Sequence, residues 1–532
     1  MILQSADYNM DQALTVLEAR RLVLQDELDA AKTQAERNRL GQFATPSLLA
    51  LDMLSYATRL MPQGQHIRFL DPAFGTGGFY SALLRVVPQS CIAAAAGYEI
   101  DAHYGTPALA LWSNTGLHLH LTDFTRATPP ALEQRCNLLI CNPPYVRHHH
   151  LLKGEKIRLQ ERVAHACGIR VGGLAGLYCY YMGLAHAWMA DGGLAGWLIP
   201  SEFMDVNYGK AIKNYLLERV TLVHMHRFDP DEVQFADALV SSAIVWFRKA
   251  PPPKEHQVQF TFGGSLSKPT RSSLIPVETL QHEAKWTRFP LALPMRRAHA
   301  PILADFFSIK RGLATGDNSY FILSKEQIVE HDLPKEVFRP ILPSPRYITT
   351  DEIMADQQGY PLVERPLFLL DCRLPEASVQ ERYPTLWTYL EEGEKRDVAR
   401  RYLCLHRKPW YSQEVRPAPR FVCTYMGRSN LKHGRLFRFI LNHSQATVAN
   451  VWLALYPKSP LASVLEDNPE LTRKVWEILR TIQPETLMGE GRVYGGGLHK
   501  LEPKELANVP AQAIAELLPD SMTSNTIQMS LF

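Results

Sequence analysis

The chain has 532 residues, 46% of them hydrophobic, and its 57 Lys and Arg nearly balance its 54 Asp and Glu. This composition excludes a disordered chain and suggests about two to four domains with real cores. Eight cysteines without a Cys-x-x-Cys pair argue against a disulfide framework and a tetracysteine zinc site. We expect no membrane span and no signal peptide, and therefore a cytoplasmic location.

Residues 1–40 form the first predicted region, an N-terminal amphipathic helix. From Asp11 to Leu40 the composition is helical, with leucines and a valine spaced among many charges. Such a helix buries its apolar side against a neighbour. The sequence leaves two neighbours open, which are the domain that follows and a partner or second copy of the chain.

A strand, a glycine loop and a helix are predicted from His66 onward. The apolar strand runs into Asp71-Pro72-Ala73-Phe74-Gly75-Thr76-Gly77-Gly78-Phe79, and the helix is predicted from Tyr80 to Val87. Glycines let the backbone approach a ligand, and a helix start presents free N–H groups. The pattern predicts a nucleotide-binding loop, but its spacing is not the dinucleotide Gly-x-Gly-x-x-Gly, which disfavours nicotinamide and flavin cofactors.

Two carboxylates follow the next two apolar runs. Glu99 comes after the run Cys91 to Tyr98, where it is placed as an acceptor for ribose hydroxyls. Asp123 follows the alternating segment Leu117 to Leu121, and Phe124 beside it offers an aromatic wall for an adenine. Ordinary exposed acidic turns are the alternative interpretation of both.

The tetrapeptide Asn142-Pro143-Pro144-Tyr145 directly follows the buried-strand pattern of residues 137–141. Prolines lack N–H donors, so this loop can aim backbone carbonyls outward, and the Asn142 amide oxygen adds another acceptor. Tyr145 supplies a flat face on which a base can stack. The loop predicts a pocket for a planar amino group, whereas a plain turn with a half-buried tyrosine is the alternative.

In this order, the segments resemble the gamma class of S-adenosylmethionine-dependent N6-adenine DNA methyltransferases of type II restriction-modification systems. Gly41 to Pro46 is similar to the family's first cofactor motif, Asp71 to Gly77 to its methionine-binding loop, and Asn142 to Tyr145 to its catalytic loop. The resemblance covers most of the chain and implies S-adenosylmethionine as cofactor and double-stranded DNA as partner. The implied cofactor contacts are Thr45, Asp71, Pro72, Ala73, Gly75, Gly77, Glu99, Ile100, Asp123 and Phe124.

The resemblance also implies a mechanism. The Asn142 side-chain oxygen and the Pro143 carbonyl would accept the two N6 hydrogens of an adenine that has been flipped out of the duplex. Pro144 completes the catalytic loop, and Tyr145 and Phe235 would stack on the extruded base, although Phe235 also fits a plain core position. No metal is needed, and His148-His149-His150 is interpreted as a basic loop facing DNA.

Two basic segments are candidates for contacting DNA phosphates. Residues 395–438 hold twelve Lys and Arg and two acidic residues, a net charge of +10, with aromatic residues interleaved. Residues 147–170 carry a net charge of +4 directly after the catalytic loop. Solvated charged surfaces are the alternative for both. The predicted DNA-binding residues are Arg147, Lys408, Trp410, Arg428 and Arg435.

The predicted fold is α/β, with a mostly parallel Rossmann-like methyltransferase sheet covered by helices on both faces and a C-terminal mixed α+β target-recognition domain. The catalytic domain covers residues 41–250 and ends at Pro251-Pro252-Pro253. A connecting segment (251–300) and the recognition domain (301–518) follow. Within the latter, Arg311 to Phe321 and Arg492 to Pro503 resemble parts of the family's recognition region.

The last predicted region, 519–532, is a flexible tail that ends in large apolar residues. Its end resembles the short peptide by which bacterial replication and repair proteins bind the DNA sliding clamp; that peptide comprises Gln528, Met529, Ser530, Leu531 and Phe532. Packing of the tail on the enzyme itself is equally open. A separate, cognate restriction endonuclease is a further expected partner, because no nuclease motif is recognisable in the chain.

Several other functions remain open from the sequence. The pocket chemistry would accept the N4 amino group of cytosine in DNA or an adenine in structured RNA. Methylation of a glutamine amide in release factors is disfavoured by the long C-terminal half. A non-catalytic DNA-binding module with a degenerate methyltransferase fold is disfavoured by the intact Asp71, Gly75, Gly77 and Asn142 to Tyr145.

Overall fold

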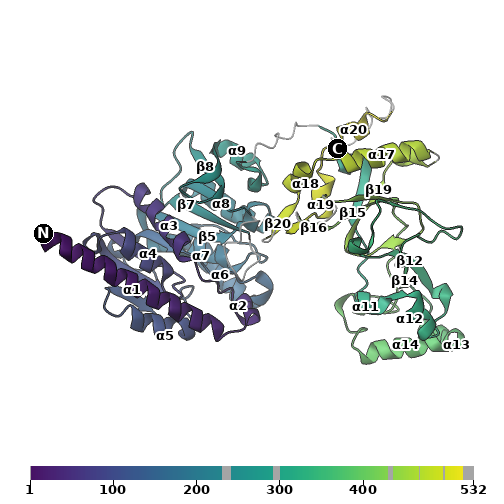
Figure 1. Cartoon of the computed structure of the whole chain (residues 1–532), viewed down its shortest axis with the longest axis horizontal. Helices are drawn as coiled ribbons and strands as arrows, with labels where there is room; N and C mark the ends of the chain where they lie inside the picture. The colour runs from purple at the N-terminus through teal and green to yellow at the C-terminus, as the bar shows by residue number, and fades with distance from the viewer. Residues whose placement is uncertain are drawn as a thin grey trace. The chain divides into compact units, whose positions relative to one another are not determined.

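The structure is a computed structural model that describes residues 2–229, 241–290, 300–428, 435–466, 468–494 and 498–518. The chain forms two compact units, one of residues 1–293 together with 494–496, and one of residues 294–493 together with 497–532. Figure 1 shows the two units in sequence colours. In the described part, no helix combines the length and the apolar character needed to cross a membrane.

The first unit is built on a sheet of nine strands, ordered β3-β2-β1-β4-β5-β7-β6-β8-β9. β1 to β5 all pair in parallel, whereas β7 runs antiparallel to both of its neighbours, β5 and β6. The strands are β1 (Ile67–Asp71), β2 (Ile92–Tyr98), β3 (Leu117–His120), β4 (Cys136–Cys141), β5 (Met189–Pro200), β6 (Thr221–Arg227), β7 (Ser242–Arg248), β8 (Gln257–Gly264) and β9 (Pro269–Pro276).

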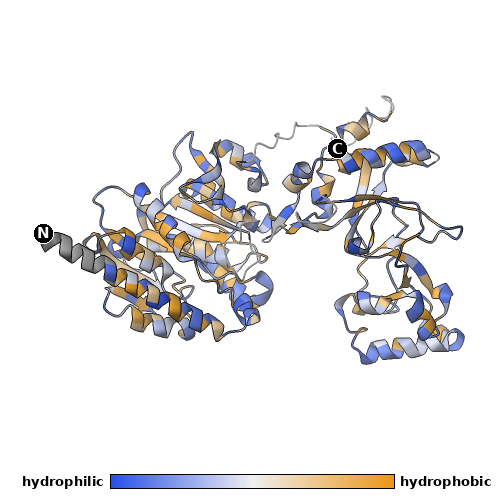
Figure 2. Cartoon of the chain, in the orientation of Figure 1, coloured by the Kyte–Doolittle hydropathy of each residue, from blue (hydrophilic) through white to orange (hydrophobic). Residues whose placement is uncertain are grey.

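Helices cover both faces of this sheet, which confirms the predicted fold class. One core cluster joins the sheet to α6, α7 and α8, and the other joins it to α3, α4 and α5. β4 is buried along its whole length, as a central parallel strand requires; the sheet strands form the hydrophobic centre of the unit in Figure 2. The helices are α1 (Ile2–Ala30), α2 (Gln34–Leu40), α3 (Ser47–Leu60), α4 (Gly78–Val86), α5 (Ala102–Leu111), α6 (Lys153–Cys167), α7 (Leu177–Ala185), α8 (Lys210–Glu218) and α9 (Val277–His282).

The N-terminal region differs from the single helix expected over Asp11 to Leu40. The chain forms α1 and then α2, because Thr33 starts a new helix with a capping box: its side chain accepts from the Glu36 backbone N–H while the Glu36 carboxylate accepts from the Thr33 N–H. α1 packs along α5 and against α4 (Figure 1). Its neighbour is therefore the catalytic unit itself, one of the two options left open.

The sheet also continues beyond the triple proline. β8 pairs in parallel with β6, and β9 pairs with β8, so residues expected to form a connecting segment extend the sheet instead. Pro251, Pro252 and Pro253 form the link between β7 and β8, and the first unit reaches Leu293. Prolines end a strand but do not by themselves end a domain.

The second unit is a mixed α+β assembly with several smaller sheets. One five-stranded sheet has the order β10-β19-β15-β17-β13, and a four-stranded sheet has the order β11-β14-β12-β18. Its helices and strands are β10 (Phe307–Arg311), β11 (Ile322–Ser324), β12 (Phe338–Leu342), β13 (Glu352–Ile353), β14 (Leu367–Leu370), β15 (Phe421–Thr424), β16 (Met426–Arg428), β17 (Phe439–Asn442), β18 (Thr447–Val448), β19 (Trp452–Pro457), β20 (Arg492–Tyr494), β21 (Leu498–Lys500), α10 (Leu303–Phe306), α11 (Asn318–Phe321), α12 (Lys325–Glu330), α13 (Glu376–Arg382), α14 (Pro384–Lys395), α15 (Tyr402–Leu405), α16 (Leu461–Leu465), α17 (Pro469–Thr481), α18 (Pro484–Glu490), α19 (Pro503–Ala507) and α20 (Gln512–Ala515).

Candidate active site

A cavity of about 600 Å³ lies at the carboxyl ends of β1, β2 and β4. The chain leaves β1 toward β2 on one side and reaches β4 on the other, which is the switch point where open α/β sheets bind ligands. The predicted residues that line the cavity are Pro72, Ala73, Gly75, Glu99, Ile100, Asp123, Phe124, Asn142 and Pro144. The structure thus brings the segments around residues 72, 99, 123 and 142 to one place.

The amide of Asn142 presents a buried acceptor. Its Nδ2 donates to the Phe43 carbonyl at 3.0 Å and to the Thr45 Oγ1 at 3.1 Å. Because a carbonyl can only accept, the first contact fixes which end of the amide is nitrogen. Asn142 Oδ1 is buried and has no hydrogen-bond partner. A buried unpaired acceptor costs free energy, so this oxygen is suited to a donor that arrives with a ligand.

The Tyr145 side chain is more buried than expected for a tyrosine on which a base can stack. Its side chain is 8% exposed, its hydroxyl donates to the Leu198 carbonyl at 3.2 Å, and its ring centroid is 5.6 Å from that of Phe43. The neighbouring Pro144 and Val146 line the cavity. Tyr145 therefore anchors the catalytic loop to β5, and stacking of a base on it stays a prediction.

Gly41 joins the first cofactor motif to the catalytic loop. Its carbonyl accepts from the Tyr145 N–H at 3.0 Å, and a Cβ at this position would lie 2.3 Å from the Tyr145 nitrogen. Its φ of +66° also disfavours any other residue. The loop that carries Asn142 is consequently held by a segment about 100 residues earlier in the chain.

The glycine loop after β1 is organised around the buried Asp71. Its carboxyl accepts from the Ala73 N–H at 3.1 Å. Burial raises the pKa of Asp71 to about 8, and the charge of Glu99 adds to the rise. Gly77 has a φ of +89°, and a Cβ there would lie 2.6 Å from the Phe74 and Trp112 side chains. This glycine permits both the turn and the packing beneath it.

Glu99 connects β2 to the glycine loop. Its carboxylate accepts from the Gly75 N–H and from the Asp101 N–H, both at 2.8 Å, and burial raises its pKa. Asp123 accepts from the backbone N–H and the hydroxyl of Thr125, both at 2.8 Å. Glu99 lines the large cavity and Asp71 lines the smaller recess beside it; both have raised pKa values, so a cationic ligand would stabilise their ionised forms.

Several residues that line the cavity escaped the sequence interpretation, among them two residues of α1 and two tyrosines. Gln25 and Asp29 reach it from α1, Tyr104 from α5 and Tyr181 from α7, where the Tyr181 ring centroid lies 5.5 Å from that of Phe124. A signal for the first two exists in the sequence. Glu18, Arg21, Gln25 and Asp29 recur every three or four residues, which places polar side chains along one face of an otherwise leucine-rich helix.

The basic segment 395–438 is used largely within the second unit. Arg407 donates to the carbonyls of Ala314 and Thr315, both at 2.6 Å, and Arg438 pairs with Asp351 at 2.8 Å. Four of the interleaved aromatic residues are buried: Tyr411, Tyr425, Phe437 and Phe439. Trp410 packs against Tyr320 and Phe321 in the same kind of core.

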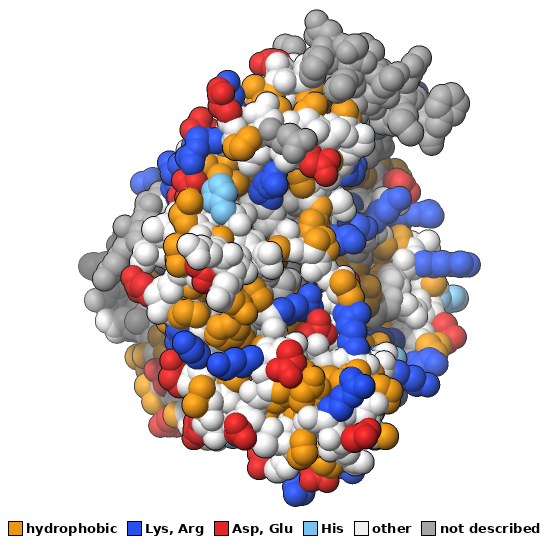
Figure 3. Space-filling view, turned by 90° about the vertical axis from the view of Figure 1, so that its right-hand side faces the viewer, with side chains coloured by type: hydrophobic (Ala, Val, Ile, Leu, Met, Phe, Trp, Pro, Cys, Tyr) orange, Lys and Arg blue, Asp and Glu red, His pale blue; other side chains and the backbone are white. Residues whose placement is uncertain are grey.

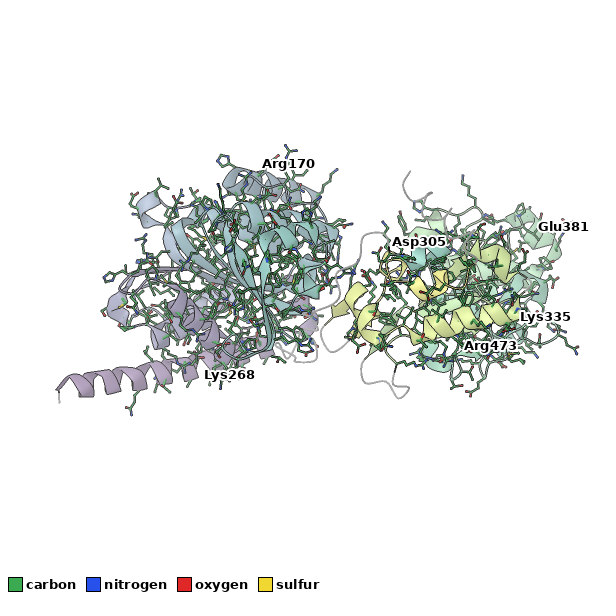
Figure 4. All side chains as sticks on the ribbon, turned by 90° about the horizontal axis from the view of Figure 1, so that it is seen from above. Arg170, Lys268, Asp305, Lys335, Glu381 and Arg473 are labelled. Atoms are coloured by element: carbon green, nitrogen blue, oxygen red, sulfur yellow. The ribbon has the colours of Figure 1, made fainter. Side chains whose placement is uncertain are left out.

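Other basic side chains remain exposed. Lys408 is exposed, and Arg435 is exposed but 4.0 Å from Asp351. On the face in Figure 3, Lys and Arg are interspersed with acidic and hydrophobic side chains. In Figure 4, Arg473 lies on the outside of the second unit, where it pairs with Glu352.

The basic side chains of the segment 147–170 also fall into two groups, those bonded within the protein and those that are exposed. Arg158 donates to the Thr125 carbonyl at 2.9 Å, and Arg162 donates to the Ala127 carbonyl at 2.7 Å, so both fix the loop after Asp123. Arg147 is exposed, as is Arg170, which projects outward in Figure 4. His148–His150 form a short 3-10 turn. Among the residues that the structure describes, no group of three or more His, Cys, Asp or Glu could hold a metal ion.

Three predicted features lie outside the described residues. These are Phe235, the side chain of Arg428 and the peptide Gln528 to Phe532. Thr45 does not line the large cavity, but it contacts Asn142 and lines a smaller recess beside it, together with Asp71. Gly77 precedes α4 as its N-terminal cap residue.

Two family models match the chain. The Eco57I restriction-modification methylase model covers residues 120–235, and the model described as type II methyltransferase M.Eco57I, C-terminal domain, covers residues 292–529. The type II methyltransferase M.XamI of Xanthomonas campestris pv. amaranthicola is 27% identical over 492 residues, which are 90% of this chain and 86% of that protein. M.AccI of Acinetobacter calcoaceticus is 24% identical over 88% of this chain and 85% of that protein.

A solved structure with a similar fold is that of the type IIL restriction-modification enzyme MmeI in complex with DNA. It aligns with a TM-score of 0.54 and 12% identity over 95% of this chain and 80% of that chain. Glu99 at the cavity and Asp71 at the recess beside it also fit the positive charges of S-adenosylmethionine, the cofactor predicted from the sequence. Over the ranges that the two family models match, the chain is similar to the Eco57I restriction-modification methylases, and it is a type II DNA methyltransferase that uses S-adenosylmethionine.

Proposed function

We propose that this enzyme methylates the N6 nitrogen of an adenine flipped out of double-stranded DNA. The observation that carries the proposal is the buried, unpaired Oδ1 of Asn142 at the wall of the cofactor cavity. Its Nδ2 is already occupied by Phe43 and Thr45, so only the acceptor end of the amide is available to the substrate. The order of the segments, with the cofactor motifs before the catalytic loop, supports the gamma class.

The chemistry requires two acceptors because the amino nitrogen of adenine shares its lone pair with the ring. Asn142 Oδ1 accepts one N6 hydrogen and the Pro143 carbonyl accepts the other, which moves the nitrogen toward tetrahedral geometry. S-adenosylmethionine supplies an electrophilic methyl group on its sulfonium. The nitrogen–carbon bond forms as the carbon–sulfur bond breaks, and one proton leaves the nitrogen for solvent. Positioning of the acceptors carries much of the rate.

Flipping the adenine costs a few kcal/mol, which contacts in the pocket must offset. Pro144 and Val146 offer apolar contacts at the cavity wall. Tyr145 supports the loop from behind through its contact with Leu198. We expect Phe235 to pack on the base from the opposite side, as the family resemblance implies.

The test is single-molecule sequencing of plasmid DNA from cells that express the wild type or the Asn142→Ala protein. We expect N6-methyladenine at one short motif with the wild type and none with the variant. If N4-methylcytosine is the only modification found, the substrate is cytosine and not adenine. Methylation of folded RNA, with no signal on DNA, would contradict the proposal. Thermal stabilisation of Asn142→Ala by S-adenosylhomocysteine is the control for an intact cofactor site.

We also propose that the enzyme protects DNA from a cognate restriction endonuclease and binds the sliding clamp through Gln528 to Phe532. The first proposal is tested by transforming methylated and unmethylated plasmid into a strain that carries the candidate nuclease. For the second, a binding titration should show that removing residues 528–532 abolishes affinity for the clamp. Equal clamp affinity of the full and shortened chains would refute it.

A further inference from the structure

A charged network on α1 lies beside the glycine loop. Arg21 donates to Glu18 through Nε and Nη2, both at 2.7 Å, and the two side chains are only 3% and 9% exposed. The Ser81 hydroxyl of α4 donates to the same carboxylate at 2.6 Å. Burial alone would raise the pKa of Glu18, but hydrogen bonds from Arg21, Ser47 and Ser81 lower it to about 2. The pair is therefore ionised.

Arg21 also lines a narrow recess of about 60 Å³ that adjoins the large cavity. The recess and the cavity share Gln25, Phe43, Ala44, Ala73, Gly75 and Asn142. Consider a ligand whose adenine lies beside Asp123 and Phe124 and whose reactive centre lies beside Asn142. The remaining part of that ligand can enter this recess. The recess lies on the glycine-loop side, which the resemblance assigns to the methionine portion of the cofactor.

The chemistry of the recess matches an amino acid tail. Of the residues that line it, Arg21 carries the positive charge and Asp71 the carboxyl group. The Nη1 of Arg21 has one long contact, to the Thr76 Oγ1 at 3.2 Å, while the Thr76 hydroxyl itself donates to Gln25 at 2.6 Å. A Cβ on Gly78 would lie 3.7 Å from Arg21 Nη1, so the guanidinium directly borders the glycine loop.

We propose that Arg21 binds the carboxylate of the methionine portion of S-adenosylmethionine, so that α1 forms part of the cofactor site. Glu18 and Ser47 accept hydrogen bonds from the guanidinium, and Ser81 donates to Glu18. Nη1, which donates to Thr76, lies beside the glycine loop that lines the recess. The proposal goes beyond the choice of methylated base, and it can fail while N6 methylation stands, because it concerns cofactor binding alone.

The test compares two ligands that differ in the amino acid tail. S-adenosylhomocysteine has the carboxylate, whereas 5′-methylthioadenosine keeps the adenosine and the sulfur but lacks the tail. The variant is Glu18→Gln with Arg21→Met, which removes both charges and leaves no buried ion unpaired. Calorimetric titration of the purified full chain should show S-adenosylhomocysteine binding weakened about 10- to 100-fold, the range for a lost charged hydrogen bond. Binding of 5′-methylthioadenosine should change less than about 3-fold.

Arg20→Met is the matched control, because Arg20 is exposed on the same helix; it should leave both affinities unchanged. Arg21→Lys keeps the charge and should lie between the wild type and the double variant. Equal weakening of both ligands would mean that Arg21 only holds α1 in place, and unchanged affinity for S-adenosylhomocysteine would remove it from the site. Either result overturns the proposal, and thermal unfolding without ligand verifies that each variant is folded.

Discussion

Polar groups have opposite roles in two regions of the molecule. At the cavity of the first unit, Asn142 keeps a buried oxygen without a partner. In the basic segment of the second unit, Arg407 and Arg438 are bonded to the unit's own carbonyls and carboxylate. Both regions stand out in the sequence, one by motif and one by charge. Asn142 has hydrogen-bonding capacity left for a ligand, whereas the contacts of Arg407 and Arg438 hold the fold.

The largest effect is expected at the catalytic loop. Asn142→Ala removes the acceptor, and we expect the single-turnover rate of methyl transfer to fall by about 100- to 1000-fold, as for the loss of one positioned group at other reacting centres. Affinity for S-adenosylhomocysteine should be nearly unchanged. A turnover rate within a few-fold of the wild type would contradict the role of the amide oxygen.

A decrease in pH should destabilise the first unit. His224 and His226 of β6 are 1% and 0% exposed, and burial lowers their pKa values from 6.5 to about 3 and about 4. Below pH 6.5 the unfolded histidines bind protons while the folded ones stay neutral, so stability decreases as pH falls toward 4. Linkage gives an upper bound of about 2 kcal/mol per histidine between pH 7 and pH 5.

Urea unfolding at the two pH values measures this loss. The variant His224→Gln with His226→Gln, in which neither position can titrate, is the control, and its stability should depend less on pH than that of the wild type. An identical pH dependence of the wild type and the variant would assign the acid sensitivity to other groups.

Arg407→Ala tests the structural role of the basic segment. The substitution leaves the carbonyls of Ala314 and Thr315 without their donor, and we expect a loss of about 2 kcal/mol in the free energy of unfolding. Chemical denaturation of the full chain, followed by a tryptophan signal, measures it. Unchanged stability combined with weaker DNA binding would instead make Arg407 a DNA contact.

The smallest effect on stability is expected from Lys408→Ala, its exposed neighbour. Stability should change by less than about 0.5 kcal/mol. If Lys408 contacts a phosphate, DNA affinity falls equally for all sequences, and the slope of its salt dependence decreases by about 1. A DNA affinity with an unaltered salt slope would exclude this contact.

The fold and much of the site could be predicted because their signals are local. An apolar run such as residues 137–141 gives a buried strand, and short motifs at strand ends meet at one edge of a parallel sheet. The position of α1 could not be predicted in this way, since the surface on which an amphipathic helix packs depends on the tertiary structure. Gln25 and Asp29 could be assigned to a polar face of the helix but not to the cavity, and they were missed for that reason.

The role of the arginines could not be predicted either. A count of charges along residues 395–438 does not show which guanidinium groups face backbone carbonyls, because those carbonyls come from segments distant in sequence, such as Ala314 for Arg407. The position of strands β8 and β9 in the first sheet could not be predicted either. A triple proline marks a turn, but it does not show whether the chain then returns to the same sheet.

The bond between Gly41 and Tyr145 has a consequence for recognising such enzymes from short motifs. Phe43 and Thr45 orient the amide of Asn142, and Gly41 holds the loop that carries it. Catalytic activity therefore depends on two segments of the chain and not on one. A homologous chain with Asn-Pro-Pro-Tyr but a bulky residue in place of Gly41 would match the catalytic motif and still fail to aim its oxygen. The glycine belongs in any pattern that is meant to identify active members.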